Sequence, residues 1–290
     1  MFVYLDGRFI ASDQAMVSVF DHGFLYGDGI YETMRAYEGR LFLLERHLAR
    51  LKRSAQAISL RLPLSLEQIG NALNETLKVN ELRNAYVRLH VSRGPGEIGL
   101  DPALCPAPTM VIVAKQFHEY PASYFEKGVR VALVQTRRNH PLALDPAIKG
   151  TNFLNNILAK IESLKKGAYE GIMLNWKGYI AEGTISNIAV VRRGILTTPH
   201  KDTGILAGVT REFIIRLAKR KKIPVRETLL LPKQLLSADE CFITNTTMEI
   251  MPVTMVDKKR IGKGRPGPVT QLLTAEYRSE VATWLRKQAV

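Results

Sequence analysis

The chain has 290 residues, of which 46% are apolar and 23% charged, and this composition is that of an ordinary globular protein large enough for two domains. No apolar run approaches the roughly 20 residues that a membrane-spanning helix needs, and residues 1–13 lack the long apolar core of a signal peptide. The two cysteines, Cys105 and Cys241, match no metal-binding or redox spacing, so we expect a reduced, cytoplasmic protein without a metal site.

The chain is strongly basic, with a formal net charge of +14. Its basic clusters are dispersed and are not interleaved with aromatic residues, as a base-stacking surface would be. The largest, at residues 219–222, falls at the end of a predicted helix, where cations interact favourably with the helix dipole. We therefore expect no nucleic-acid partner. A basic nucleic-acid-binding module remains the alternative from another class, and the same field would attract small phosphates and carboxylates.

The first part of the chain predicts a small α/β domain. Alternation around Asp6-Gly7 predicts a hairpin over residues 3–10, and residues 21–29 are typical of a loop. Hydrophobic periodicity then predicts alternating strands and helices. The expected strands are 30–37, 85–92 and 109–115, and the expected helices are 43–60 and a segment that begins at Ser65.

The second part predicts a larger α/β domain after a break in the pattern. Residues 117–127 contain charges and Pro121 and precede Gly128, which indicates an interdomain linker. We assign the first domain to residues 1–118, the linker to 119–127 and the second domain to 128–290. The expected strands of the second domain are 129–136, 171–174, 185–191, 195–197, 225–229 and 240–244, and its expected helices are the one after Lys149, 210–222 and 269–286.

A single lysine, Lys149, ends a short apolar run and is followed by Gly150. After it, apolar residues recur at three- and four-residue steps, which predicts one apolar face of a helix. They are Leu154, Ile157, Leu158, Ile161 and Leu164. Lys149 is thus expected at a strand-to-helix junction, where burial of its stem favours the uncharged amine of a Schiff-base lysine. From its spacing alone, a surface lysine in a loop is the favoured interpretation.

Three further blocks follow Lys149 in order: Gly178-Tyr179-Ile180-Ala181-Glu182-Gly183-Thr184-Ile185-Ser186-Asn187, Gly204-Ile205-Leu206-Ala207-Gly208-Val209-Thr210-Arg211 and Thr244-Asn245-Thr246-Thr247-Met248-Glu249-Ile250-Met251-Pro252. With Lys149 they closely resemble the class IV aminotransferases, the fold-type IV pyridoxal-phosphate enzymes, over nearly the whole chain. That family contains branched-chain aminotransferases, D-amino-acid aminotransferases and aminodeoxychorismate lyases. The resemblance implies a two-domain α/β (α+β) fold with pyridoxal 5'-phosphate bound to Lys149 in a cleft between the domains.

The cofactor also needs an anion site and a partner for its pyridine nitrogen. Gly208-Val209-Thr210 opens a predicted helix whose free N–H groups would face an anion, and Thr246 to Glu249 has capping-box spacing, which predicts a second helical start. Each pattern alone is more often a simple cap. The resemblance assigns the phosphate contacts to Val209, Thr210, Thr246 and Arg50, the arginine of a His-x-x-Arg-Leu pattern, and it assigns the pyridine nitrogen to Glu182.

The candidate substrate residues lie mainly in the first domain. Tyr86 and Arg88 share one face of a predicted strand and match the Tyr-x-Arg pattern of branched-chain members. Tyr31 and Arg35 match pocket positions of the family. Thr246 and Thr247 match residues whose amides hold the substrate carboxylate. From the residues alone, Arg35 and Arg88 are as consistent with structural salt bridges.

The resemblance implies a ping-pong transamination, an aliphatic L-amino acid as first substrate, 2-oxoglutarate as acceptor and a homodimer or higher homo-oligomer. Thr33 is typical of D-amino-acid and lyase members, so a D-amino-acid aminotransferase and an aminodeoxychorismate lyase remain alternatives. The Arg-x-His carboxylate site of D-amino-acid enzymes is absent from residues 92–101, and the lyases carry lysine at the position of Arg88. Phe153 replaces a tyrosine that many relatives place near the cofactor hydroxyl.

Overall fold

The protein, described here by a computed structural model that covers Met1–Lys287, divides into two compact units. The first unit is Met1–His118 with Ile148–Asn152, and the second is Glu119–Ala147 with the described residues from Phe153 onward. Residues 119–127, expected as a linker, belong to the second unit and contain helix α4 (Ala122–Lys127). The segment that carries Lys149, expected in the second domain, groups with the first unit instead.

The first unit is built on an antiparallel six-stranded sheet of order β2-β1-β6-β5-β3-β4. Its strands are β1 (Phe2–Leu5), β2 (Arg8–Ala11), β3 (Gly29–Tyr37), β4 (Arg40–Leu41), β5 (Ala85–Ser92) and β6 (Thr109–Gln116). The predicted hairpin is confirmed, because Asp6 and Gly7 both adopt positive φ between β1 and β2. The predicted strands 30–37, 85–92 and 109–115 are confirmed as β3, β5 and β6.

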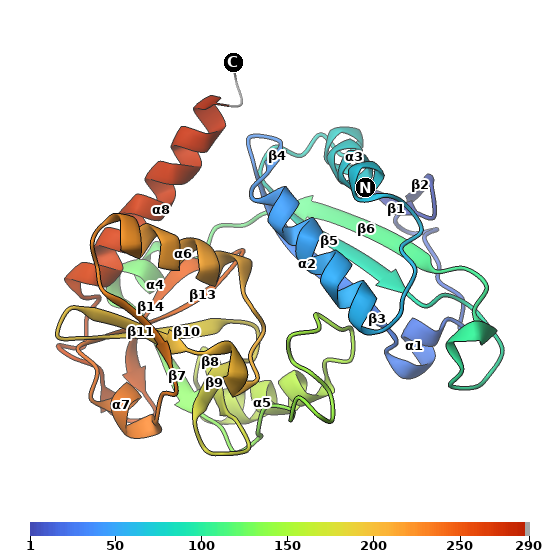
Figure 1. Cartoon of the computed structure of the whole chain (residues 1–290). Helices are drawn as coiled ribbons and strands as arrows, with labels where there is room; N and C mark the ends of the chain where they lie inside the picture. The colour runs from blue at the N-terminus through green and yellow to red at the C-terminus, as the bar shows by residue number, and fades with distance from the viewer. Residues whose placement is uncertain (288–290) are drawn as a thin grey trace. The chain divides into compact units, whose positions relative to one another are not determined.

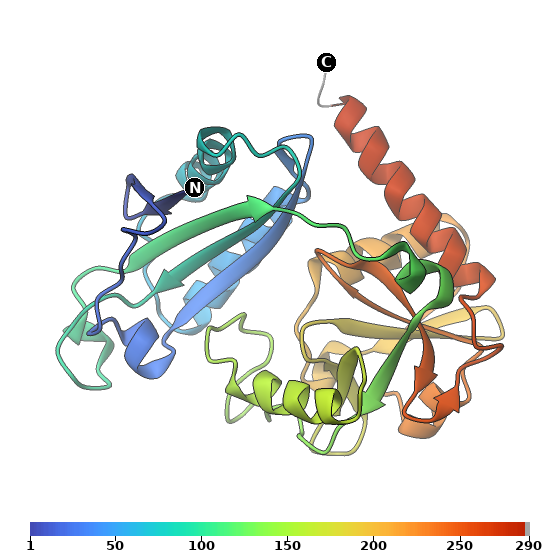
Figure 2. The ribbon, with the colours of Figure 1, turned by 180° about the vertical axis from the view of Figure 1, so that it is seen from behind.

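Helices α2 (Leu44–Ala57) and α3 (Leu66–Val79) pack against the sheet, and Figure 1 shows α2 lying along one face. Residues of β5 are alternately buried and half-buried, because successive side chains point to opposite faces of the sheet. The helices cover one face, and Figure 2 shows the sheet from the opposite side. The predicted start of α3 is confirmed as a capping box between Ser65 and Gln68. Residues 21–29, expected as a loop, contain the short helix α1 (His22–Tyr26), which Asp21 caps.

The second unit is built on a mixed nine-stranded sheet of order β12-β11-β10-β13-β14-β7-β8-β9, with β15 paired to β14. Its strands are β7 (Val129–Leu133), β8 (Glu170–Leu174), β9 (Ile180–Gly183), β10 (Asn187–Arg192), β11 (Ile195–Pro199), β12 (Val225–Thr228), β13 (Glu240–Asn245), β14 (Glu249–Val256) and β15 (Lys259–Arg260). Its longer helices are α5 (Leu154–Lys165), α6 (Val209–Arg220) and α8 (Pro268–Lys287), with the short helix α7 (Pro232–Leu236). Both units therefore have the predicted mixed α/β architecture.

Two local predictions for the second half of the chain are wrong. The strand expected over 129–136 ends at Leu133, so Lys149 follows an irregular segment and not a strand. No helix begins at Thr246, because the Asn245 Oδ1 atom accepts from the backbone amides of Thr247 and Met248 at 2.9 and 2.8 Å. This side chain closes a tight turn between β13 and β14, and such Asx turns compete with helix starts of similar composition.

Helix α5 is present as predicted, but its apolar stripe is exposed in the part of the chain that the structure describes. The five stripe residues are all exposed, by 66% at Leu154, 51% at Ile157, 48% at Leu158, 43% at Ile161 and 60% at Leu164. Instead the helix turns Asn156, Ala159 and Ser163 inward. A contiguous exposed aliphatic stripe on a helix is typical of a surface that another molecule covers.

None of the helices within Met1–Lys287 is both long enough and apolar enough to cross a membrane.

Candidate active-site residues

Backbone hydrogen bonds join the segment that contains Lys149 to strand β3. The Tyr31 amide donates to the Lys149 carbonyl at 3.0 Å, and the Thr151 amide donates to the Gly29 carbonyl at 2.9 Å. The Lys149 amide in turn donates to Ser54 Oγ of α2 at 3.1 Å. These three bonds fix the backbone on both sides of the lysine, although the segment forms only an isolated antiparallel bridge and no named strand.

The Lys149 side chain lies against Tyr31. Its Nζ donates to Tyr31 Oη at 3.1 Å and lies 4.2 Å from the centre of the same ring. Burial raises the pKa of Tyr31, and the nearby Arg88 cation only partly offsets this effect, so the phenol stays protonated. A neutral phenol can both accept from and donate to the amine beside it.

Tyr31, Arg88 and His90 form one connected group on the sheet face that α2 and α3 do not cover. Tyr31 and His90 are directly paired across β3 and β5, and their rings stack with centroids 5.7 Å apart. The Arg88 guanidinium lies 4.2 Å from the centre of the Tyr31 ring, and its Nη1 donates to Tyr86 Oη at 3.4 Å. The structure thus brings together three of the predicted substrate residues, Tyr31, Tyr86 and Arg88, beside the predicted catalytic lysine.

Arg50, predicted to bind the cofactor phosphate, is held on the helix-covered face of the sheet by Glu32. Its Nε and Nη2 donate to the two carboxylate oxygens of Glu32, both at 2.7 Å, and His47 Nδ1 donates to the same carboxylate at 2.8 Å. Burial alone would raise the pKa of Glu32, but Arg50 and His47 outweigh it and lower this pKa to about 2. The three side chains form a buried polar network that fixes the guanidinium on α2.

Arg35, the fourth predicted substrate residue on the first unit, is 3% exposed. Its guanidinium lies over the ring of Phe117 at 3.3 Å and 4.7 Å from the centre of the Tyr37 ring. Such stacking stabilises a buried guanidinium by cation–π attraction. Its role in a substrate pocket stays a prediction.

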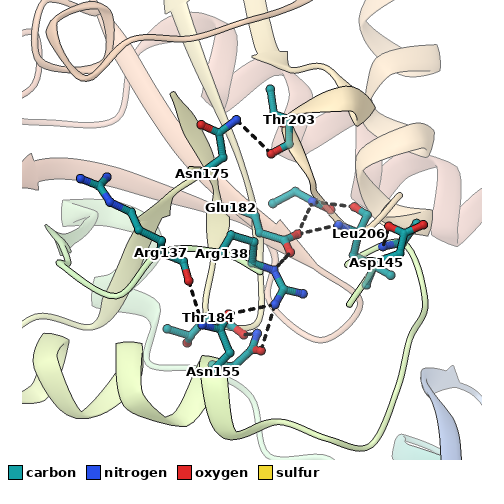
Figure 3. Close-up of polar contacts among 12 residues, drawn as sticks. Arg137, Arg138, Asp145, Asn155, Asn175, Glu182, Thr184, Thr203 and Leu206 are labelled. Atoms are coloured by element: carbon teal, nitrogen blue, oxygen red, sulfur yellow. Dashed lines mark hydrogen bonds and ion pairs between the residues drawn. The ribbon is translucent and has the colours of Figure 1, made fainter. Parts of the chain in front are cut away.

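Glu182, predicted to contact the pyridine nitrogen, is a buried carboxylate of the second unit (Figure 3). Arg138 Nε donates to its Oε1 at 2.8 Å, and the Leu206 amide and Asn187 Nδ2 donate to its Oε2 at 3.0 and 3.2 Å. Arg138 also donates through Nη1 to Asn155 at 3.1 Å, as Figure 3 shows. An ion pair with two further donors keeps a buried carboxylate charged and fixed in direction.

The predicted phosphate residues Val209 and Thr210 are the first two residues of α6, and both are buried. Gly208 precedes them as N-cap without a side-chain hydrogen bond, and a Cβ at this position would lie 1.9 Å from Asn187 Oδ1. The close approach requires glycine here. The N-terminus of a 12-residue helix presents amide donors and the positive end of the dipole to an anion.

Thr246 and Thr247 lie in the turn between β13 and β14. The Thr247 amide, predicted to hold a substrate carboxylate, donates to Asn245 Oδ1, and Thr247 Oγ1 contacts the Tyr120 hydroxyl at 3.2 Å. The two threonines therefore belong to a hydrogen-bonded turn, and their contacts to cofactor and substrate stay predictions.

Sequence reasoning missed two residues of these groups, Arg138 and His90. Arg137 and Arg138 form one of the several basic clusters dispersed along the sequence. The Arg138 side chain is nevertheless only 10% exposed and binds Glu182. His90 lies two residues after Arg88 on β5, and this spacing alone could have indicated that the two share a face.

Comparison with known proteins shows the family to which the chain belongs. The family model of the class IV amino-transferases matches residues 29–256. The chain is 42% identical over 284 residues to the inferred branched-chain-amino-acid aminotransferase of Methanocaldococcus jannaschii, covering 98% of each chain. It is 35% identical to the aminodeoxychorismate lyase of Bacillus subtilis, with 99% and 97% covered, and 34% identical to the D-alanine aminotransferase of Staphylococcus haemolyticus, with 93% and 94% covered.

Among solved structures, a branched-chain amino acid aminotransferase with pyridoxamine 5'-phosphate matches with a TM-score of 0.92 at 31% identity, covering 95% of this chain and 92% of that one. The branched-chain amino acid aminotransferase of Escherichia coli matches with a TM-score of 0.93, also at 31% identity, with 96% and 93% covered. The chain therefore belongs to the class IV aminotransferases and has their fold-type IV architecture. Members of this family use pyridoxal phosphate, and the relatives include branched-chain aminotransferases as well as enzymes of two other specificities.

The half-buried histidine of the Arg88 group gives a testable dependence of stability on pH. Burial, with a smaller effect of Arg88, lowers the pKa of His90 from 6.5 to about 4. As the pH falls from about 6.5 towards 4, the unfolded chain binds a proton at this residue and the folded chain does not, so acid reduces stability. We expect this residue to remove about 2 kcal/mol of the unfolding free energy between pH 7 and pH 5.

Urea unfolding of the protein and of His90→Gln at pH 7, 6 and 5 measures this effect. The variant should lose less stability than the parent as the pH falls, and the difference between them should grow by about 2 kcal/mol. Parallel pH profiles would contradict the assignment of a neutral imidazole at this position.

Proposed function

We propose that this protein is a pyridoxal-phosphate-dependent transaminase that moves the amino group of an aliphatic, branched-chain L-amino acid to 2-oxoglutarate by a ping-pong mechanism. The observation that carries the proposal is the contact of Lys149 Nζ with Tyr31 Oη beside Arg88, in a chain that belongs to the class IV aminotransferases. The Lys149 amine has the neutral phenol of Tyr31 as a partner for proton transfer. The nearby Arg88 guanidinium could bind an anion.

The described residues fit the proposed cofactor. The donor set contains a half-buried lysine amine, a buried and charged carboxylate at Glu182 and the open N-terminus of α6. When bound, pyridoxal phosphate supplies an electron sink for the bond broken at the substrate Cα. In the proposal, Glu182 holds the pyridine nitrogen in its protonated form, and Arg50, Val209, Thr210 and Thr246 bind the phosphate.

Lys149 has two roles in the proposal. It holds the cofactor covalently before substrate arrives, and its released amine then moves a proton between the substrate Cα and the cofactor carbon. Tyr31 supports the second role, because its neutral hydroxyl lies within hydrogen-bonding distance of Nζ and keeps that atom oriented. The oxo acid leaves after the first half-reaction, and 2-oxoglutarate accepts the amino group in the second.

The proposed substrate residues are Tyr31, Arg35, Tyr86, Arg88, Thr246 and Thr247. Arg88 is the best supported of them, because the described residues include no carboxylate that pairs with its guanidinium. The alternative of a structural salt bridge at Arg88 therefore has no support within Met1–Lys287. A substrate carboxylate is the natural partner for such a cation.

The proposed preference for a substrate with a branched aliphatic side chain rests on similarity to known relatives. Identity is higher to the M. jannaschii branched-chain protein, at 42%, than to the lyase at 35% or the D-alanine enzyme at 34%. Arg88 in place of the lyase lysine favours transamination over elimination of pyruvate, whereas Thr33 on β3 is shared with D-amino-acid and lyase members. D-amino-acid transamination is accordingly the second candidate. A cytoplasmic location stays a prediction from the two isolated cysteines.

We extend the proposal to a homodimer. The exposed aliphatic stripe of α5 supports it, since a solvent-facing surface of this kind is unfavourable in an isolated chain. A second exposed apolar group lies in the first unit, on and near α1; it comprises Met16, Val17, Val19, Phe20, Phe24, Ile98 and Leu100. A second copy of the chain would cover these surfaces.

The substrate assignment predicts a specific spectral change. Purified protein reconstituted with pyridoxal phosphate should show the visible band of a lysine-bound cofactor, and L-leucine should convert this band to that of the pyridoxamine form. Subsequent 2-oxoglutarate should restore it. Bleaching by D-alanine and not by L-leucine would move the assignment to D-amino acids, and release of pyruvate from aminodeoxychorismate would move it to the lyase reaction.

The dimer predicts that charges on α5 separate the subunits. Ile157→Lys combined with Ile161→Lys places two cations in the stripe, and burying them in an apolar interface would be strongly unfavourable. We expect the molar mass from light scattering to fall from that of a dimer to that of a monomer. Leu272→Lys on α8, where the leucine is 40% exposed, is the matched control and should leave the mass unchanged. A stripe variant with the parental mass would place the interface elsewhere.

A further inference from the structure

His90 lies next to the candidate substrate residues, yet neither the family resemblance nor the proposed mechanism gives it a role. It follows Arg88 by two residues on β5, so both side chains lie on the same face of the sheet. Its cross-strand neighbours are Tyr31 on β3 and Val111 on β6. The imidazole is thus flanked by the tyrosine that contacts Lys149 on one side and by an aliphatic residue on the other.

The hydrogen bond between Arg88 and His90 defines the state of the imidazole. Arg88 Nε donates to His90 Nε2. Since a guanidinium only donates, Nε2 must offer its lone pair, and the ring must be the neutral tautomer with its proton on Nδ1. A protonated imidazole could not accept this bond and would repel the neighbouring cation. Stacking on Tyr31 further fixes the plane of the ring.

Three contacts together orient the guanidinium of Arg88. His90 accepts from Nε, Tyr86 Oη accepts from Nη1 at 3.4 Å, and the Tyr31 ring lies beneath the group with its centre 4.2 Å from Cζ. All three partners are neutral, so none of them neutralises the cation. Among the described residues Nη2 has no acceptor, and it is left for a ligand. An oriented guanidinium with its full charge is suited to a carboxylate.

From this geometry we propose that His90 is a positioning residue, whose neutral imidazole holds the Arg88 guanidinium in the orientation that binds the carboxylate of the amino-acid and oxo-acid substrates. The inference rests on the proposed function. His90 adds orientation without adding charge, and Arg88 makes the contact with substrate. A lysine at position 88 could not use this device, because it has no Nε–H to donate to the imidazole in a fixed plane.

The test compares two replacements of His90 in the reconstituted enzyme. His90→Leu removes the acceptor at similar volume, and we expect KM for L-leucine to rise about tenfold while kcat changes by less than about threefold, because the effect is on carboxylate binding. His90→Gln offers an acceptor oxygen and should recover most of the lost affinity. His118→Leu, a histidine replacement on an exposed residue of the same unit, is the matched control and should change neither constant.

Binding of an unreactive acid gives a readout that does not depend on turnover. Calorimetry with 4-methylvaleric acid should show a dissociation constant about tenfold higher for His90→Leu than for the parent, and close to the parent for His90→Gln. If His90→Leu does not fold, as judged by its melting transition, His90→Met takes its place, since methionine also offers no nitrogen acceptor.

A double-mutant cycle shows whether His90 acts through Arg88. In an Arg88→Lys background, His90→Leu should have less than a twofold further effect on KM and on acid binding, because the bond it breaks is already absent. Independent, multiplicative effects would overturn the proposal, and so would a His90→Leu enzyme with parental constants. An absent cofactor band or absent transamination in the parent would instead refute the proposed function, so the two failures are distinguishable.

Discussion

The backbone pairing of the Lys149 segment with β3 is the interaction on which the candidate site depends. Two hydrogen bonds, from Tyr31 to Lys149 and from Thr151 to Gly29, attach a five-residue stretch, Ile148–Asn152, to the first unit. With them the Lys149 amine lies 3.1 Å from Tyr31 Oη, and a loop lysine becomes part of an ordered group with Arg88 and His90.

Buried charge is organised around carboxylates that have nearby cations. Glu32 holds Arg50 and His47 on the helix-covered face of the first sheet, and Arg138 holds Glu182 in the second unit. Each carboxylate accepts at least three hydrogen bonds, so it remains charged in spite of its burial. Arg88 differs from Arg50 and Arg138, because its described partners are all neutral.

Much of the fold could be predicted from the sequence, because local signals were strong where the elements are long. The Asp6-Gly7 turn, the capping box at Ser65 and the alternation of β5 each have a short-range physical cause. The turn at Thr246 was wrongly predicted as a helix start, since capping boxes and Asx turns use the same residue types and the decisive acceptor, Asn245, lies one position earlier.

The candidate site was less accessible to sequence reasoning, because its contacts join residues far apart in the chain. Lys149 and Tyr31 are separated by 118 positions, and Arg138 and Glu182 by 44. Periodicity correctly indicated helix α5, but it could not show that the apolar stripe faces outward, since an amphipathic pattern is the same whether the chain itself or a partner covers it. Only the family resemblance singled out Lys149 and Glu182.

The covalent role of Lys149 is the central claim, and borohydride reduction of the cofactor-loaded protein tests it most directly. Reduction makes the link between lysine and cofactor permanent, and mass spectrometry of the peptides then locates it. The account predicts one phosphopyridoxyl group, on Lys149, and none on Lys149→Ala treated in the same way. A modified lysine elsewhere in the chain, or equal labelling of the Lys149→Ala protein, would contradict it.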